Sequence, residues 1–224
     1  MSSPYRRASD NPRRHDLVFV SPTAWHLFIE TRDDLTDDPL IAGWVDRGWP
    51  LIARRLAPGE GHGVPLGLPL PPSAPKRRIG LLVDPVGIRS TARPPLLSAA
   101  SRVAPAAWIP TLRTLNHVAT RLGVEARVFG SLAWGLLTGL NYLSVNSDLD
   151  FILSLPHPRD FPELMTELGS IDSAAPMRLD GEIMRDDGAG VHWRELRSGA
   201  RDVLAKTVGR PRLFNAAEFT GGSI

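Results

Sequence analysis

Apolar residues recur at helical spacing near the middle of the chain. Residues 107–122, AWIPTLRTLNHVATRL, place apolar side chains on one face of a helix: Trp108, Leu112, Leu115, Val118 and Leu122. Pro110 fits the first turn of such a helix, where the missing N–H group costs nothing. Gly123 is typical of a helix end. The pattern therefore predicts a helix over 107–122.

Shorter apolar segments follow this helix at regular intervals. Their patterns predict strands and helices in alternation: strands at 125–130, 147–155 and 175–184, and helices at 131–140 and 160–169. With the first helix, the order is αβαβαβ. After an Asp-Gly turn, the segment VHWREL (191–196) either completes a hairpin or begins a last helix that runs to about Thr207.

The first half of the chain has a different pattern, interrupted by many prolines and glycines, most densely at 57–78. It contains three candidate strands and one candidate helix: strands at 15–20, 50–56 and 77–84, and a helix around 23–30. A Pro/Ala/Ser stretch at 94–105 separates the two patterns. We therefore expect an α+β protein, with a β-rich N-terminal domain in residues 1–100 and an αβαβαβ domain with a mixed sheet in residues 101–224.

The composition limits the possible cellular location of the protein and the possible chemistry of its site. The chain contains no run of 18 apolar residues, and its polar, Arg-rich start has no apolar segment typical of a signal peptide. We therefore expect no membrane span and a cytoplasmic protein. The sequence contains no cysteine, which excludes disulfides, thiolate nucleophiles and Cys-ligated zinc. Carboxylates and histidines remain as possible metal ligands.

Charge argues against a nucleic-acid partner. The formal net charge is +2, and neither half of the chain carries a strong basic excess. Residues 1–100 contain 13 Arg or Lys against 10 Asp or Glu, and residues 101–224 contain 13 against 14. A nucleic-acid-binding domain usually shows a clear basic patch. We therefore expect no nucleic acid among the partners.

Two aspartates stand two residues apart in the strand-like segment SDLDFILSL, residues 147–155. Side chains alternate along a strand, so Asp148 and Asp150 face one way and the apolar residues between and after them face the core. Neighbouring carboxylates repel each other unless a cation lies between them. A pair of Mg²⁺ ions, ~3.5–4 Å apart, is a common solution in enzymes that transfer phosphoryl or nucleotidyl groups. We therefore expect Asp148 and Asp150 to be catalytic and to bind two Mg²⁺ ions.

A third carboxylate usually completes such a metal site. The predicted strand with the sequence MRLDGEI places Asp180 and Glu182 on one face. We favour Asp180 as the third metal ligand because Leu179 precedes it inside the strand, and we keep Glu182 as the alternative.

Gly130 and Ser131 precede the aspartates, at the junction of a predicted strand and a predicted helix. A glycine there lets the backbone approach a phosphate closely, and the first N–H groups of the helix and the Ser131 hydroxyl are donors. We therefore expect Gly130 and Ser131 to bind the phosphates of a substrate. Lys206, near the end of the predicted last helix, is a further candidate for a substrate phosphate.

Each of these motifs also has a purely structural interpretation. A Gly-Ser pair is usually a turn or a helix cap, and a lone Asp-x-Asp is usually a solvated strand end. A lysine near a helix end complements the helix dipole. The combination is more specific, because the aspartates follow Ser131 by 17 residues in a strand–helix–strand frame and a third acidic strand comes after them.

The frame of Gly-Ser, two alternating aspartates and an acidic strand resembles the polymerase-β-like nucleotidyltransferase superfamily over residues 105–185. Longer segments resemble the malonate decarboxylase holo-acyl-carrier-protein synthases, also called phosphoribosyl-dephospho-CoA transferases. The segments that carry this resemblance run through most of the chain: RRHDLVFV (13–20), GWPLIARR (48–55), VPLGLPLPP (64–72), GSLAW with LTGLNYL and SDLDFIL (130–153), RLDGEI (178–183), WREL (193–196) and VLAK (203–206). One departure is Gly135, where the family is expected to have a polar residue, often glutamine.

The resemblance implies a nucleotidyltransferase-like catalytic domain and a specific reaction. A serine of the acyl-carrier subunit of malonate decarboxylase attacks the α-phosphorus of triphosphoribosyl-dephospho-CoA, and diphosphate leaves. By this analogy Asp148 and Asp150 bind Mg²⁺ and activate the serine, while Gly130 and Ser131 hold the diphosphate. The N-terminal domain would recognise the substrate or the carrier. Two alternatives remain: another nucleotidyltransferase that adenylylates a small molecule or a protein, and a non-catalytic carrier-binding protein.

Overall fold

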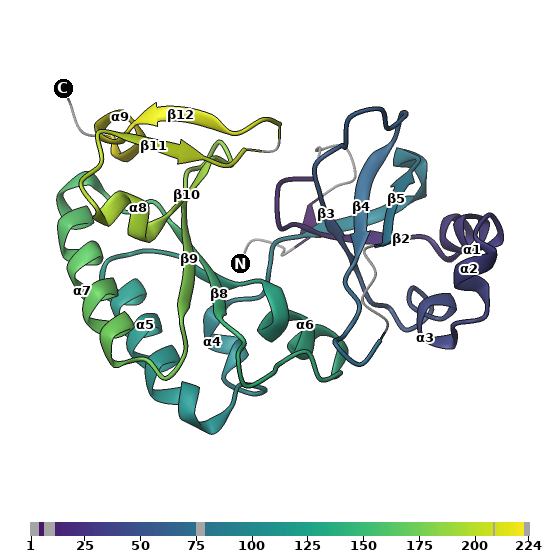
Figure 1. Cartoon of the computed structure of the whole chain (residues 1–224), viewed down its shortest axis with the longest axis horizontal. Helices are drawn as coiled ribbons and strands as arrows, with labels where there is room; N and C mark the ends of the chain where they lie inside the picture. Colours follow the sequence, from purple (N-terminus) through teal and green to yellow (C-terminus); the bar gives the residue numbers. More distant parts are fainter. Residues whose placement is uncertain (1–4, 7–11, 75–78, 208, 222–224) are drawn as a thin grey trace. The chain divides into compact units, whose positions relative to one another are not determined.

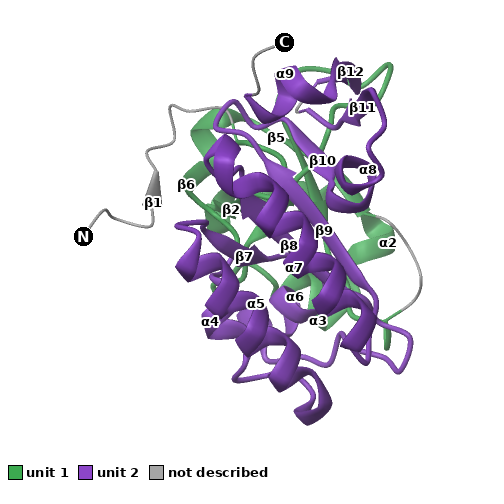
Figure 2. Cartoon of the chain, turned by 90° about the vertical axis from the view of Figure 1, so that its left-hand side faces the viewer, with its two compact units in different colours: residues 1–94 green, residues 95–224 purple. Residues whose placement is uncertain are grey.

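A computed structural model of the protein describes residues 5–6, 12–74, 79–207 and 209–221. The chain divides into two compact units, Met1–Pro94 and Pro95–Ile224, drawn in different colours in Figure 2. The passage from one unit to the other lies at the start of the Pro/Ala/Ser stretch. No helix among the described residues is long and apolar enough to span a membrane.

The N-terminal unit is built on a six-stranded antiparallel sheet in the order β1-β6-β2-β3-β4-β5. The strands are β1 Tyr5–Arg6, β2 Leu17–Val20, β3 Leu51–Ala53, β4 Val64–Leu68, β5 Ile79–Val83 and β6 Ile88–Ala92. Three helices connect β2 to β3: α1 Pro22–Glu30, α2 Asp33–Thr36 and α3 Pro39–Ala42. A 3₁₀ turn, Pro85–Gly87, precedes β6. The unit is β-rich, as predicted.

Local sequence explains where α1 starts. Ser21 is its N-cap, and the Ser21 hydroxyl accepts a hydrogen bond from the Ala24 N–H at 3.2 Å. Pro22 follows in the first turn, where no N–H group is needed. The buried Trp25 then donates from its indole to the Ala42 carbonyl at 2.9 Å, which ties α1 to α3.

The C-terminal unit has a four-stranded mixed sheet in the order β10-β9-β8-β7. Its strands are β7 Ala126–Val128, β8 Leu149–Ser154, β9 Leu179–Met184 and β10 Gly190–His192. The central pair β8 and β9 is parallel, and the outer pairs are antiparallel. A separate hairpin follows, formed by β11 Asp202–Ala205 and β12 Arg212–Asn215.

In the described part of the C-terminal unit, six helices accompany this mixed sheet. They are α4 Leu97–Ala100, α5 Ile109–Arg121, α6 Gly130–Thr138, α7 Phe161–Ala174, α8 Trp193–Arg197 and α9 Ala216–Thr220, with 3₁₀ turns at Ala106–Trp108 and Pro158–Asp160. Figure 1 shows α5 and α7 side by side on the same side of β8 and β9. The buried residues of α5 and α7 join the apolar residues of β8 and β9 in one core.

The predicted α+β class is confirmed, with an antiparallel sheet in the first unit and a mixed sheet in the second. Segment 191–196 contains both predicted features: its first two residues complete a hairpin, because β10 pairs with β9, and a helix, α8, begins at Trp193. The prediction of a last helix to about Thr207 is wrong. Helix α8 ends at Arg197, Gly199 adopts a positive φ of 73°, and β11 follows. Lys206 therefore follows a strand and is not at a helix end.

One close contact in the core depends on a glycine. Gly181 in β9 lies opposite Phe151 in β8, and a Cβ atom at residue 181 would come within 2.2 Å of the Phe151 ring. The Phe151 side chain is fully buried, so it has no free space into which it can move. Gly181 therefore allows the two central strands to pair around this ring.

We expect Gly181→Ala to lower the free energy of unfolding by about 1–3 kcal/mol, because the added methyl group overpacks the core. The midpoint of urea unfolding measures this. Gly135→Ala in α6 is the matched control, because its Cβ would meet nothing closer than the Leu140 carbonyl oxygen at 3.6 Å. Alanine favours a helix over glycine, so the control should gain about 0.5–1 kcal/mol. Equal midpoints for the two variants would contradict this view of the core.

Candidate active site

Four carboxylates gather on the face of the mixed sheet opposite to α5 and α7. Asp148 directly precedes β8, Asp150 lies within β8, and Asp180 and Glu182 lie within β9. The parallel register places Asp180 directly beside Asp150. The residues that alternate with them, such as Leu149 and Leu179, are fully buried in the core. The structure thus brings together all four acidic residues that the sequence had singled out.

Asp150 is the most strongly perturbed member of this cluster. Burial raises the pKa of Asp150 to about 7, and the negative charges of Asp180 and Asp148 add to the effect. A hydrogen bond from the Ser131 backbone N–H opposes this rise in pKa. Asp150 therefore lies at a position that favours added positive charge.

The donor set suits a hard divalent cation. Mg²⁺ prefers oxygen ligands, keeps several waters and is usually held by one or two carboxylates together with substrate phosphates. Asp148 and Asp150 supply such carboxylates, and Asp180 lies beside them. Within the described ranges, no three Asp, Glu, His or Cys side chains are already arranged as a complete metal-binding group. The residues fit Mg²⁺ that is held jointly with phosphate oxygens.

Gly130 and Ser131 lie against this cluster at the start of α6. Gly130 has a positive φ of 61°, and a Cβ atom there would come within 1.9 Å of Asp150 Oδ2. Only a glycine therefore allows Asp150 to lie against this turn. The Ser131 N–H donates to the Asp150 carboxylate, so the turn contacts the predicted catalytic residue directly.

Arg178 is a member of the site that the sequence analysis missed. Its guanidinium lies 3.3 Å from Asp180 Oδ2 (from Nη2) and 3.9 Å from Asp148 Oδ2 (from Nη1). The Arg178 side chain is 59% exposed, and exposed ion pairs of this kind contribute little to stability. One exposed cation thus bridges two of the carboxylates. The only available signal was the position of Arg178 two residues before Asp180, which is on the same strand face.

Glu182 and Lys206 form an ion pair of their own. The Lys206 ammonium donates to Glu182 Oε1 at 3.0 Å, and the Glu182 side chain is only 3% exposed. Two backbone hydrogen bonds with Gly190, of 2.9 and 2.8 Å, hold Lys206 beside the sheet. Lys206 thus balances the charge of Glu182, as Arg178 does for Asp180.

His192 is a second residue to which the sequence analysis gave no role. Its Nε2 atom lies 3.2 Å from Asp180 Oδ1. Burial lowers the pKa of His192, the charge of Asp180 opposes this, and Arg194 and Lys206 lower the pKa further. Strand pairing places His192 opposite Glu182, and the sequence points to this pairing only if 191–196 forms a hairpin.

Comparison with known families now bears on this site. The family model of the phosphoribosyl-dephospho-CoA transferase MdcG N-terminal domain matches residues 13–94, and that of the MdcG C-terminal domain matches residues 95–217. The chain belongs to the phosphoribosyl-dephospho-CoA transferase family. The resemblance to the phosphoribosyl-dephospho-CoA transferases is confirmed, and the protein is accordingly a transferase.

Curated relatives of this family carry the same name. A phosphoribosyl-dephospho-CoA transferase of Bradyrhizobium diazoefficiens is 47% identical over 223 residues, which cover 100% of this chain and 99% of the relative. One from Xanthomonas axonopodis pv. citri is 35% identical, covering 87% and 90%. One from Pseudomonas putida is 30% identical, covering 91% and 94%. No solved structure matches the chain.

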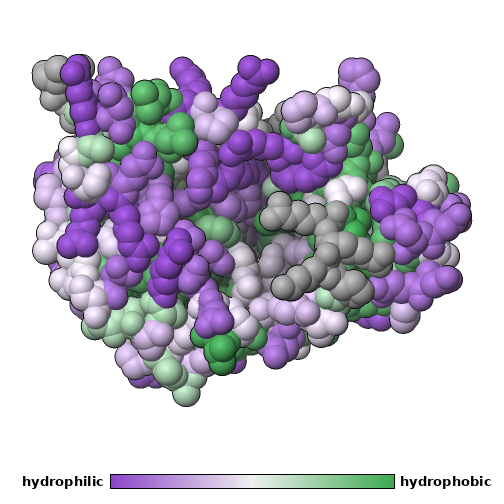
Figure 3. Space-filling view, viewed as in Figure 1, coloured by the Kyte–Doolittle hydropathy of each residue, from purple (hydrophilic) through white to green (hydrophobic). Residues whose placement is uncertain are grey.

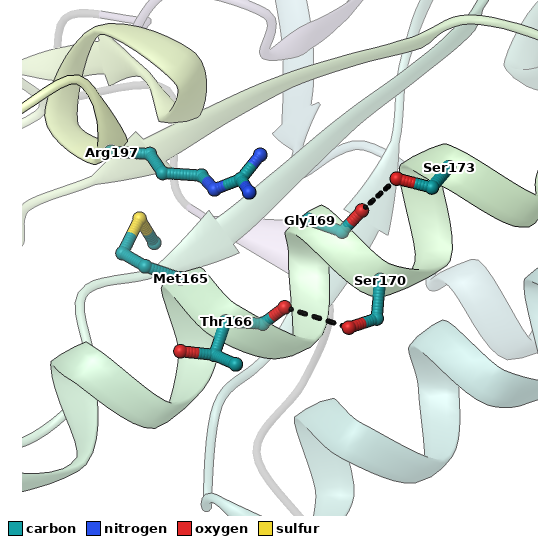
Figure 4. Close-up of a pocket in the computed structure, with 6 residues that line it drawn as sticks. All are labelled: Met165, Thr166, Gly169, Ser170, Ser173 and Arg197. Atoms are coloured by element: carbon teal, nitrogen blue, oxygen red, sulfur yellow. Dashed lines mark hydrogen bonds between the residues drawn. The ribbon is translucent and has the colours of Figure 1, made fainter.

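The surface over β9, one of the strands that carry the carboxylates, is largely hydrophilic. Hydrophilic side chains cover much of the surface over α8, β9 and β10 in Figure 3. A hollow of about 430 Å³ lies elsewhere, between α7 and Arg197, and contains none of the four carboxylates (Figure 4). The Ser170 and Ser173 hydroxyls in this hollow donate to carbonyl groups of their own helix. This hollow is therefore distinct from the carboxylate cluster.

We expect Gly130→Ala to lower the transfer rate of this transferase by at least about 10-fold, because the new methyl group would displace Asp150. Gly139→Ala is the matched control. Gly139 ends α6 with a positive φ of 73°, and a Cβ there would meet nothing within 4 Å.

Both variants should lose about 1–2 kcal/mol of stability, since both force an L-residue into the left-handed region. Only Gly130→Ala should lose more activity than its loss of stability explains. Transfer assays on folded protein, combined with unfolding midpoints, make the comparison. Equal activities for the two variants would show that the approach of Asp150 to residue 130 is unimportant.

Proposed function

We propose that this protein transfers the 2′-(5″-phosphoribosyl)-3′-dephospho-CoA group from its 5″-triphosphate precursor to a serine of the acyl-carrier subunit of malonate decarboxylase. Diphosphate would be released. Family membership supports the donor, and the family's name implies a carrier as acceptor. The observation that carries the proposal is the position of Asp150 between two other aspartates and the Gly130 turn. We also propose that the protein acts in the cytoplasm.

The reaction is a single displacement at phosphorus. The serine oxygen forms a bond to the α-phosphorus, and the bond from that phosphorus to the diphosphate oxygen breaks. The proton of the hydroxyl passes to a carboxylate of the aspartate cluster as the oxygen attacks. Asp148, Asp150 and Asp180 would hold two Mg²⁺ ions, which would supply positive charge to the attacking and leaving oxygens.

The remaining groups of the site suit the leaving diphosphate. The Ser131 hydroxyl lies at the first turn of α6, where the helix dipole favours negative charge. Lys206 is 45% exposed although it is paired with Glu182, so its ammonium retains donors for a phosphate oxygen. We assign Gly130, Ser131 and Lys206 to substrate binding. We assign recognition of the substrate or the carrier to the N-terminal unit.

The proposal is tested by incubating the protein with apo carrier, the triphosphoribosyl precursor and Mg²⁺, and then weighing the carrier by mass spectrometry. The carrier should gain the mass of the prosthetic group. Asp148→Asn and Asp150→Asn should each lower the rate by about 100-fold or more, because the site loses charge at the reacting phosphate. Asp186→Asn, at an exposed carboxylate outside the cluster, is the control and should retain the rate.

Other outcomes would favour the alternatives. An unmodified carrier, together with transfer of a nucleotide from ATP to another acceptor, would favour a different nucleotidyltransferase. Tight carrier binding without release of diphosphate would favour a non-catalytic carrier-binding protein. Undiminished modification by both aspartate variants would refute the catalytic assignment.

Removal of divalent cations tests the proposed cofactor. Treatment with EDTA should abolish modification of the carrier, and excess Mg²⁺ should restore it, because the aspartates alone add negative charge beside the phosphates. The unfolding midpoint should change little, because the sheet that carries the four carboxylates does not need the metal in order to form. Full activity in EDTA would contradict the role of Mg²⁺.

A further inference from the structure

The two ring nitrogens of His192 have different partners. Nδ1 accepts a hydrogen bond from the Arg194 backbone N–H at 3.1 Å, which makes His192 the N-cap of α8. A nitrogen that accepts such a bond carries no proton. A neutral imidazole has one N–H group, so the proton of neutral His192 lies on Nε2.

Nε2 faces the carboxylate cluster. It lies 3.2 Å from Asp180 Oδ1, a distance at which Nε2–H donates to that oxygen. The ring is held in this orientation from several directions. It stacks on the fully buried Trp193 at 6.4 Å between ring centroids, and only 22% of the His192 side chain is exposed. The Trp193 indole in turn donates to the Leu179 carbonyl at 3.2 Å, next to Asp180.

Asp180 therefore divides its two oxygens between different kinds of partner. Oδ1 contacts the enclosed His192, whereas Oδ2 contacts the exposed guanidinium of Arg178, which also approaches Asp148. An exposed guanidinium can be exchanged for another cation at little cost. The half-buried His192 ring cannot be exchanged without loss of the α8 cap. Oδ2 is thus the oxygen that remains available on the side of Asp148.

We infer that His192 is a positioning residue: its Nε2–H holds Oδ1 of Asp180 and thereby keeps Oδ2 directed toward the cation site shared with Asp148. The role of Asp180 as third carboxylate rests on the proposed function. The orientation of the carboxylate by His192 rests on the hydrogen bonds alone. Loss of an outer partner that orients a metal-binding carboxylate commonly lowers metal affinity or activity by about 10–100-fold.

Two substitutions of His192 distinguish the capping role of Nδ1 from the contact of Nε2 with Asp180. His192→Asn keeps an acceptor near the Nδ1 position, and asparagine is a good N-cap, but nothing reaches Asp180. His192→Gln keeps an N–H group near the Nε2 position but gives up the cap. We expect His192→Asn to keep the melting temperature and to lower kcat by about 10-fold or more. We expect His192→Gln to keep kcat within about threefold of wild type and to lower the melting temperature by about 2–4 °C.

His157 provides a matched control. Its Nδ1 also caps a short turn, accepting from the Arg159 N–H at 3.3 Å, and its side chain is exposed. No carboxylate contact of His157 is found in the described part of the chain. His157→Asn should therefore leave both kcat and the melting temperature unchanged.

A spectroscopic measurement tests the inference without transfer activity. Nitrogen-15 NMR of the full chain at neutral pH, free of metal and substrate, should show His192 protonated at Nε2 and unprotonated at Nδ1. In the Asp180→Asn background, His192→Asn should cause no further loss of kcat, because the partner is already changed. If wild-type protein transfers nothing, the proposed function fails while the NMR result still decides the orientation of His192.

Three results would overturn the inference. One is a proton on Nδ1 of neutral His192. Another is full kcat in His192→Asn. The third is an equal loss of kcat in the Asn and Gln variants, which would show that His192 matters only for the fold of α8.

Discussion

Mutual repulsion among carboxylates is the constraint around which the C-terminal unit is organised. The parallel register of β8 and β9 places Asp150 beside Asp180, with Asp148 and Glu182 at the edges of the same cluster. Such a cluster is costly unless positive charge or N–H donors surround it. The neighbouring elements provide these cations and N–H donors, and the positions of these groups define the site.

Each of the three outer carboxylates lies near at least one cationic or N–H partner. Arg178 approaches Asp148 and Asp180, His192 donates to Asp180, and Lys206 pairs with Glu182. Asp150, at the centre, has the Ser131 backbone N–H and carries a pKa raised to about 7. Asp150 therefore has the least positive charge around it. A divalent cation that also binds a substrate phosphate would contribute most at this residue.

The sheet beneath the cluster accepts this arrangement because two glycines remove steric conflict. Gly130 lets Asp150 lie against the start of α6, and Gly181 lets β9 lie beside the buried ring of Phe151. Both glycines serve close approach between segments distant in sequence. The carboxylate face and the core face of the same strands thus depend on separate glycines.

Local patterns in the sequence were enough to predict helix α5, the alternation of β8 and the acidic face of β9, because these follow from periodicity within a helix and alternation along a strand. The sequence also determined the family, through motifs spread over most of the chain. The three-dimensional contacts moved Lys206 from a predicted helix to the residue after β11, and they brought Arg178 and His192 to the cluster. The physical reason is that these contacts arise from pairing between β8, β9, β10 and the following hairpin, and strand pairing between distant segments leaves no periodic signal in the sequence.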